Sequence, residues 1–473
     1  MSADFDNTRA FELPNINDYS DEQLEIEYLP LIGNYLIVGG PGTGKSVLAL
    51  SRSRLLAKKH ERDSKLVYKF LVHNKMLSHS SEQLYPECNN DTWLSWFWKL
   101  FIQEFGINPK HYSNSNDSYT LHWDNISKLL DCRRRIKNLE DSLNNPFDFD
   151  SFYAQSDSSS ELHQTYNNLL LSTSGLLGEP QIAYAKHIFK YIVLSVVNKN
   201  SMLSLENSYL VIDEGQDMPQ KFYEFLLGLG CLNIFIAADQ NQQITPENNS
   251  DIHELMDVID VSEPKDLTEN FRQANGGYYV ALLAEQFYCD EATPKSKLPR
   301  KSESIEMPLL IDYDQQKRPF NKICQQIINS YQLMPNKLVG IFTADNEIRL
   351  KYYETLKAMI DKEDNEIILS TYFHQKNKKN MSDIRFDKGG IMVINGKSCK
   401  GLEFDRVYIA DINKFKVEEN SDITKKLFYV MTSRAREKLI MLRDTSDVAC
   451  PVIDSAIIPI DENILKRNRI PVS

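Results

Sequence analysis

The sequence predicts an α/β fold built on parallel sheets. Three apolar runs, residues 36–38, 209–212 and 234–238, have the length and composition of strands that are buried on both faces. The first run leads into a glycine-rich turn and the helix-like residues 47–50, and the other two end in acidic or amide side chains. Residues beyond the carboxyl ends of parallel strands line the ligand crevice, so we expect the functional groups of this chain to gather there.

The turn after the first run has the spacing Gly39, four residues, Gly44, Lys45 and Ser46. This is the phosphate-loop pattern, in which glycines let backbone N–H groups close around phosphate oxygens at a helix N-terminus. A plain turn is the alternative, and the presence of every fixed residue argues against it. The pattern predicts a nucleoside triphosphate site, with Lys45 at the β and γ phosphates and the Ser46 hydroxyl on Mg²⁺. The binding residues expected here are Gly39, Gly40, Gly42, Thr43, Gly44, Lys45 and Ser46.

Acidic residues follow the second apolar run directly, as Asp213 and Glu214. At the carboxyl end of a strand they would face the phosphate loop, where Asp213 can hold Mg²⁺ through water and Glu214 can deprotonate an attacking water. An acidic turn is the alternative, but it does not explain the order of phosphate loop first and acidic strand end later. The third run precedes Gln242, whose amide can both donate to and accept from a γ-phosphate group.

Composition bounds the class of protein. The chain has 473 residues, 42% of them hydrophobic and 25% charged, which is typical of a soluble protein of two to four domains. A net charge of −12 argues against coating nucleic acid by bulk electrostatics but leaves room for a local basic and aromatic groove. The seven cysteines are scattered singly and no run is long enough to cross a bilayer, so we expect a cytoplasmic protein with no structural zinc and no membrane contact.

Several segments leave alternatives open. Gln23 completes a capping-box pattern with Ser20, or its amide binds adenine. The tryptophan-rich residues 92–98 form either a buried aromatic cluster or a surface that stacks on bases. Residues 100–181 have the composition of a mainly helical insertion, and its basic residues 133–137 are either a solvated helix face or a nucleic-acid contact.

Three later motifs join these features in a fixed order. Residues 213–217 read Asp-Glu-Gly-Gln-Asp, residues 400–404 read Lys-Gly-Leu-Glu-Phe, and residues 429–435 read Tyr-Val-Met-Thr-Ser-Arg-Ala. With the phosphate loop they resemble the motifs of superfamily 1 helicases of the UvrD/Rep type, and the resemblance runs from about residue 23 to residue 442. It implies two RecA-like P-loop NTPase lobes, with residues 1–99 and 182–262 in the first and residues 263–473 in the second.

The resemblance also implies roles for individual residues. ATP would lie between the lobes, with Gln23 and Phe271 at adenine and Glu403 at the ribose. Gln242 would contact the γ-phosphate, and Arg272 and Arg434 would act as arginine fingers that stabilise charge in the transition state. Single-stranded or partly duplex DNA would be held by two groups of residues, namely His73, Asn74 and Lys75, and Thr92, Trp93 and Ser95.

The sequence departs from the family at three places. Val47 stands where many relatives have an arginine beside adenine, which bears on base specificity for ATP, and the other two departures bear on activity. After Gln242 the sequence lacks the tyrosine and tryptophan that relatives stack on bases, and fewer than fifty residues separate Asn346 from Val393, too few for the large regulatory insertion of the second lobe. The first hypothesis is an ATP-dependent DNA translocase or helicase moving 3′ to 5′. The alternative is a DNA-gated ATPase switch that regulates a protein partner such as a nuclease. A small-molecule kinase is a remote third hypothesis.

Overall fold

The computed structural model consists of two compact units. One unit comprises residues 1–92, 209–218 and 234–473, and the other comprises residues 93–208 and 219–233. No helix among the described residues is long and apolar enough to cross a membrane, and within them no group of three or more His, Cys, Asp and Glu could hold a metal ion. The residues that the structure describes are 14–84, 88–105, 123, 126–127, 130, 133–134, 203–245, 249–301, 306–314, 320–363, 366–372, 384–386, 388–446 and 449–469.

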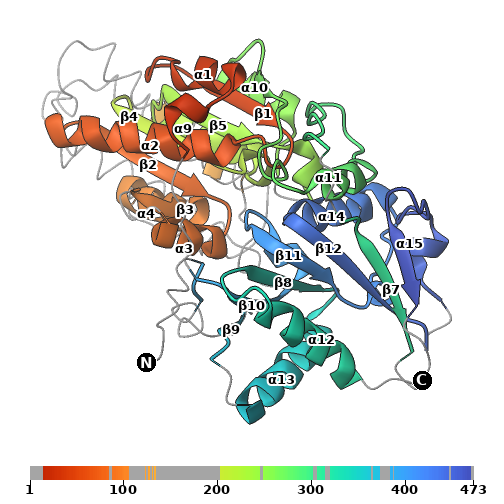
Figure 1. Ribbon diagram of the computed structural model, residues 1–473. Helices are drawn as coiled ribbons and strands as arrows, with labels where there is room; N and C mark the ends of the chain where they lie inside the picture. The colour runs from red at the N-terminus through yellow and green to blue at the C-terminus, as the bar shows by residue number, and fades with distance from the viewer. Residues whose placement is uncertain are drawn as a thin grey trace, which may run out of the picture. The chain divides into compact units, whose positions relative to one another are not determined.

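The first sheet has six strands in the order β3-β2-β4-β5-β1-β6 (Figure 1). Strand β1 lies between β5 and the edge strand β6 and pairs in parallel with both, and β2 pairs in parallel with β3. Continuous apolar stretches explain this placement, because β5 is buried at every residue and β1 at every residue except the first. The strands are β1 Tyr35–Gly39, β2 Val67–Val72, β3 Asn90–Thr92, β4 Ser208–Ile212, β5 Asn233–Ala238 and β6 Lys265–Leu267.

The first unit also contains four helices that accompany this sheet: α1 (Asp21–Glu27), α2 (Lys45–Arg62), α3 (Lys75–Leu84) and α10 (Ile252–Ile259). Each of α1 and α10 begins with a complete capping box, which satisfies backbone N–H groups that have no partner inside the helix. The caps therefore fix where these helices begin.

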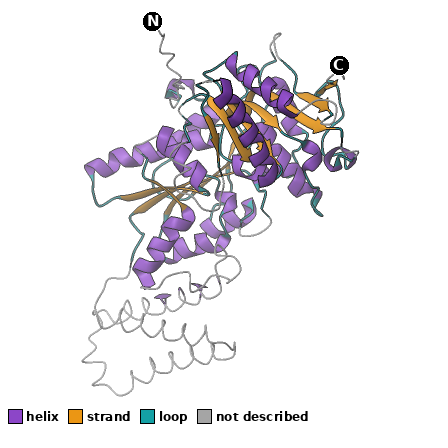
Figure 2. Ribbon diagram, turned by 90° about the horizontal axis from the view of Figure 1, so that it is seen from below, coloured by secondary structure: helices purple, strands orange, loops and turns teal. Residues whose placement is uncertain are grey.

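The second sheet has seven strands in the order β13-β7-β12-β11-β8-β10-β9, and every pair with a defined register is parallel. Helices lie on both faces of it (Figure 2). The strands are β7 Leu309–Tyr313, β8 Leu338–Thr343, β9 Leu369–Thr371, β10 Gly390–Asn395, β11 Phe404–Ile409, β12 Ala435–Asp444 and β13 Lys466–Arg469; the helices are α11 Tyr278–Glu285, α12 Phe320–Gln332, α13 Asn346–Glu363, α14 Ser421–Ser433 and α15 Pro451–Asp454.

Alternating side chains divide the core of the second sheet into two layers. In β11, Val407 and Ile409 join the cluster that contains α11 and α14, whereas Tyr408 joins the cluster that contains α12 and α13. Successive strand residues point to opposite faces, so one apolar strand supports both layers.

The predicted α/β fold with parallel sheets is confirmed. The structure has two parallel sheets that are consistent with RecA-like lobes. The sequence-based domain boundaries stay predictions, and β6 pairs with β1 of the first sheet although it lies beyond residue 262. Most of the expected insertion at residues 100–181 lies outside the described residues.

The second unit contains α4 (Trp93–Phe105) and α9 (Gln220–Gly228). The ring centroids of Trp93 and Phe222 are 5.1 Å apart, and those of Phe97 and Phe225 are 4.9 Å apart. Trp93, Trp96 and Phe97 are buried, so the aromatic-cluster interpretation of residues 92–98 is confirmed for these three side chains.

Arg133 is also buried in the second unit, so the interpretation as a solvated face was wrong for this residue. Its Nε donates to Glu104 at 2.7 Å, and its Nη1 donates to the Gly228 carbonyl at 2.7 Å. The guanidinium thus satisfies groups inside the unit.

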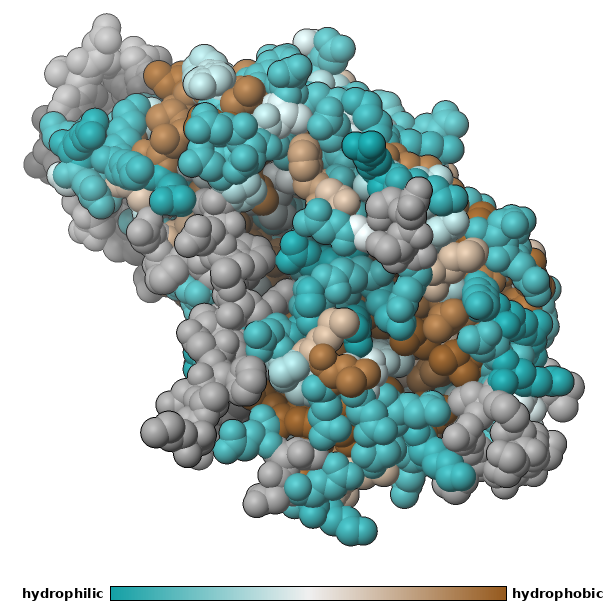
Figure 3. All heavy atoms as spheres, in the orientation of Figure 1, coloured by the Kyte–Doolittle hydropathy of each residue, from teal (hydrophilic) through white to brown (hydrophobic). Residues whose placement is uncertain are grey.

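The face of the molecule in Figure 3 is mainly hydrophilic, with apolar side chains in separate groups. This distribution agrees with the charged fraction of the sequence.

Candidate nucleotide-binding site

The phosphate loop connects β1 to α2 and bends where its glycines allow positive φ. Gly42 has φ 78° and Gly44, the residue before α2, has φ 93°. Space is restricted as well, because a Cβ on Gly44 would lie 2.2 Å from Gln23 Nε2, and one on Gly39 would lie 2.7 Å from the Leu267 carbonyl oxygen. Only glycine fits these positions without displacing neighbours.

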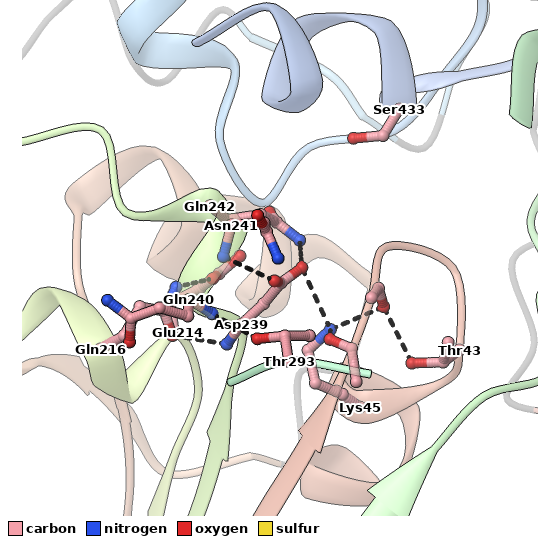
Figure 4. A network of polar contacts seen from close by, with 12 residues as sticks. Thr43, Lys45, Glu214, Gln216, Asp239, Gln240, Asn241, Gln242, Thr293 and Ser433 are labelled. Atoms are coloured by element: carbon pink, nitrogen blue, oxygen red, sulfur yellow. Dashed lines mark hydrogen bonds and ion pairs between the residues drawn. The ribbon is translucent and has the colours of Figure 1, made fainter. Parts of the chain in front are cut away.

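Lys45 is the first residue of α2, and its side chain contacts the backbone of the phosphate loop. Its Nζ donates to the carbonyls of Gly39 at 2.6 Å and Gly40 at 2.8 Å, and it lies 3.9 Å from Asp239 Oδ2 (Figure 4). Burial lowers the pKa of Lys45, and the negative charge of Asp239 opposes that shift. The Lys45 amine is therefore buried between the loop carbonyls and Asp239.

Gln23 caps α1 and also contacts the phosphate loop, and its binding to adenine stays a prediction. The backbone N–H of Ser20 donates to its Oε1 at 3.2 Å, which completes the capping box of α1. Its Nε2 donates to the Thr43 carbonyl at 3.0 Å, and the Thr43 hydroxyl donates to the Gly40 carbonyl at 2.9 Å. The capping interpretation is confirmed, and the same side chain supports the phosphate loop.

Asp213 and Glu214 follow β4 and differ in their ionisation. Burial and the adjacent Glu214 raise the pKa of Asp213 to about 6, and a hydrogen bond with Ser46 partly opposes the shift. Burial also raises the pKa of Glu214, but the positive charges of Lys400 and Arg434 outweigh it and lower the value to about 2. Glu214 is therefore ionised, whereas Asp213 titrates in a higher range.

A polar network joins this carboxylate to the end of β5 (Figure 4). Gln216 Nε2 donates to Glu214 Oε2 at 2.7 Å, and Gln216 Oε1 accepts from the Asp239 N–H at 3.0 Å. Gln242 Nε2 in turn donates to Asp239 Oδ2 at 2.7 Å. Because Asp239 also lies near Lys45, the network spans the loop, the acidic pair and the amide predicted to sense phosphate.

Two cations reach this network from late in the chain. Lys400 Nζ lies 2.6 Å from Asp217 Oδ2 and 3.7 Å from Glu214 Oε2, and it donates to the Gln242 carbonyl at 2.5 Å. Arg434 Nη2 donates to Gln242 Oε1, while its Nε donates to the Val430 carbonyl at 3.1 Å. Both side chains are buried, so their charges act on the acidic pair with little screening by water.

Arg272 and Glu403 form an ion pair. Arg272 Nη2 lies 2.6 Å from Glu403 Oε1, and its Nη1 donates to the Ser433 carbonyl at 3.0 Å. Burial raises the pKa of Glu403, but Arg272 outweighs it and lowers the value to about 2. Phe271, which precedes Arg272 in the sequence, is 39% exposed.

One pocket of about 400 Å³ brings most of the predicted site residues together, a volume in the range of small-molecule sites. Among its lining residues are Gln23, Gly42, Gly44, Lys45, Ser46, Asp213, Glu214, Gln242, Phe271, Arg272, Glu403 and Arg434. The remaining predicted loop residues Gly39, Gly40 and Thr43 lie within the loop itself.

Residues 390–442 match the model of the UvrD-like helicase C-terminal domain. No curated protein matches the sequence. The crystal structure of the C-terminal domain of a possible DNA helicase from Lactobacillus plantarum WCFS1 is similar with a TM-score of 0.26 and 14% sequence identity, covering 40% of this chain and 95% of that one. Residues 390–442 are called the UvrD-like segment below, and they include Lys400, Glu403 and Arg434.

The predicted nucleic-acid residues lie outside this pocket. His73 Nδ1 lies 3.7 Å from Asp217 Oδ2, Asn74 Oδ1 accepts from the Leu77 N–H at 2.8 Å, and Lys75 is exposed at the start of α3. Thr92 is half-buried, and in the second unit Ser95 is exposed while Trp93 is buried. Trp93 therefore offers no open ring face to a base.

Sequence reasoning assigned no site role to two charged residues that the structure places at the centre. Asp239 follows a buried strand, as the predicted acids do, so its position was an available signal. Lys400 was visible only as part of a motif, and its partners Asp217 and Gln242 are distant in sequence.

Proposed function

We propose that this protein is an ATP hydrolase of the UvrD/Rep type that couples hydrolysis to movement on single-stranded DNA. The observation that carries the proposal is the pair of cations from the UvrD-like segment, Lys400 at Glu214 and Arg434 at Gln242. The charges of this phosphate pocket come from segments of both sheets, so its charge distribution would depend on how those segments are positioned. That dependence is what a motor needs.

ATP fits the donors that the pocket offers. The loop N–H groups and Lys45 suit phosphate oxygens, and the exposed ring of Phe271 suits a base. Ser46 and Asp213 supply the hydroxyl and carboxylate oxygens that Mg²⁺ prefers, and their mutual hydrogen bond brings the two donors together. When bound, Mg²⁺ would neutralise charge on the phosphates.

The acidic pair suggests how hydrolysis proceeds. Glu214 is ionised and held by Gln216, so it can orient a water and take its proton. Arg434 and Arg272 line the same pocket, where they can stabilise charge that develops on the transferred phosphoryl group. Gln242 contacts Arg434 and therefore links the γ-phosphate position to the UvrD-like segment.

Binding of a DNA strand would affect the nucleotide pocket through Asp217. This carboxylate lies 2.6 Å from Lys400 and 3.7 Å from His73, which stands beside the exposed Lys75. A strand that moves His73 would alter the charge around Lys400 and Glu214. We propose 3′ to 5′ movement from the family resemblance alone.

The DNA-gated switch is the second candidate function. The observation that favours it is the lack of exposed aromatic residues where relatives stack bases, since Ile244 is buried in the core and Trp93 is covered. Such a protein would use ATP to change its contact with a protein partner and would not separate strands.

Two measurements test the proposal. Nucleotide binding should be lost in Lys45→Ala but kept in the control Lys265→Ala, whose exposed ammonium pairs with Glu25. ATP-dependent displacement of a strand from a duplex with a 3′ tail would support the motor, and DNA-stimulated hydrolysis without displacement would support the switch. Wild-type protein that fails to bind ATP would contradict both.

A further inference from the structure

Gln83 holds a segment that comes from far along the chain. Its Nε2 donates to the Ile384 carbonyl at 2.7 Å, and its Oε1 accepts from the Phe386 N–H at 2.8 Å. A primary amide offers a donor beside an acceptor, as a neighbouring strand does, so one side chain pairs with both polar groups of the extended residues 384–386. These three residues are called the docked segment.

The docked segment is anchored by apolar burial as well. Ile384 is 1% exposed and Phe386 is 3% exposed, and both belong to the cluster that contains Met76 of α3 and Leu402 of the UvrD-like segment. The ring centroid of Phe386 lies 6.4 Å from that of His79, also on α3. The segment therefore has one defined position on α3.

That position puts Phe386 in the wall of the nucleotide pocket, where Leu77 and Ser81 of α3 also lie. Leu77 of this wall lies close to Gly401, because a Cβ on Gly401 would be 2.8 Å from Leu77 Cδ1. The residue before it, Lys400, is 3.7 Å from Glu214 Oε2, at the end of the pocket where hydrolysis is proposed. An apolar wall at this end would exclude bulk water from the carboxylate.

We infer that Gln83 is a positioning residue for the proposed hydrolysis, which fixes Phe386 as the apolar wall beside Glu214. The inference rests on the proposed ATPase function and deepens it. It also ties α3, whose first turn carries Lys75, to the geometry of the hydrolytic end. The amide acts through the docked segment and does not touch the nucleotide.

The test is the steady-state ATPase of the full chain with saturating single-stranded DNA. Gln83→Met keeps the shape of the side chain but removes both hydrogen bonds to the docked segment and the hydrogen bond of Gln83 Nε2 with His79 Nε2 at 2.9 Å. We expect kcat to fall roughly three- to tenfold while KM for ATP stays within about twofold. Rates are expressed per nucleotide site, counted by binding of a fluorescent ATP analogue, so that unfolded protein does not contribute. Gln325→Met is the matched control, because Gln325 bonds to Asn329 and Glu363 on an exposed face and should give wild-type values.

A double-mutant comparison separates positioning from general loosening. In a Phe386→Leu background, Gln83→Met should reduce kcat no further, because the wall it positions is already altered. If Gln83→Met folds poorly, Gln83→Glu replaces it, since it keeps the acceptor for Phe386 and loses the donor for Ile384. Wild-type kcat in the Gln83 variants, or effects that multiply in the double variant, would overturn the inference. A wild-type protein without ATPase activity would contradict the proposed function instead.

Discussion

At the scale of single residues, the pKa values of the adjacent carboxyls Asp213 and Glu214 are shifted in opposite directions. Burial raises the pKa of both, but only Glu214 has two buried cations close enough to reverse the shift. Environments that separate the pKa values of neighbouring acids are typical of sites where one group serves as a base. In this structure Lys400 and Arg434 lower the pKa of Glu214, the residue proposed as the base.

Glu214→Gln tests that assignment. The amide keeps the size of the side chain but cannot take a proton, so we expect ATP binding to remain and hydrolysis to fall by roughly two to four orders of magnitude. Quenched-flow measurement of phosphate release checks the loss, and equilibrium binding of a fluorescent ATP analogue checks the affinity. Hydrolysis at the wild-type rate would show that another group is the base.

The lowered pKa of Glu403 leads us to expect that the stability of the folded protein depends on pH. Pairing with Arg272 lowers the pKa of this carboxyl from its usual 4.5 to about 2, so the folded state gains from the ionised form. The gain is present above pH 4.5 and disappears as the pH falls toward 2. The difference in unfolding free energy between wild type and Glu403→Gln, measured by urea denaturation, should therefore shrink across that window. A difference that is constant with pH would rule out the ion pair as its cause.

At the scale of elements, the phosphate loop shows what a sequence pattern can and cannot predict. The spacing of Gly39 to Ser46 predicts the strand, turn and helix, and the structure has them as β1 and α2. The apolar runs 209–212 and 234–238 are also confirmed as strands β4 and β5, because buried parallel strands are continuous apolar runs.

β13 was not predicted, because Lys466–Arg469 is polar and exposed along its length. It forms at the edge of the second sheet through pairing with β7, where Arg467 also contacts Asp312 at 2.7 Å. A strand that is specified by an edge and a salt bridge carries no apolar periodicity for the sequence to reveal.

Gly44→Ala tests the loop as an element. Positive φ costs an alanine about 1–2 kcal/mol, and its Cβ would also meet Gln23 Nε2, so we expect lower stability and at least about tenfold weaker nucleotide binding. Gly276→Ala is the matched control, because its φ is 103° but no atom lies within 4 Å of the added Cβ. Calorimetry and nucleotide titration of both variants separate strain from collision. Equal nucleotide affinity in the two variants would contradict the role given to Gln23.

At the scale of the whole chain, the candidate site depends on contacts that no local pattern contains. Lys400 and Gln242 are 158 positions apart, and Arg434 and Gln242 are 192 apart, yet both pairs are hydrogen-bonded. The motifs predicted that these residues matter, but the ion pair of Arg272 with Glu403 and the placement of Lys400 at Asp217 required the folded chain. The function proposed at this scale is the linkage of DNA-strand binding to the charge around Glu214.

The most direct test of that linkage is the ATPase rate with and without single-stranded DNA, for the wild type and for Arg434→Ala. We predict that single-stranded DNA strongly stimulates the ATPase rate of the wild type. In Arg434→Ala the DNA-stimulated rate should be lower by about three orders of magnitude, because the arginine would stabilise the transition state only when the site is assembled. Arg434 is buried, so Arg434→Lys, which keeps the charge but not the geometry of the guanidinium, is measured beside it and should also be impaired. A wild-type rate that is indifferent to DNA, or an Arg434→Ala variant that is still stimulated, would contradict the proposed coupling.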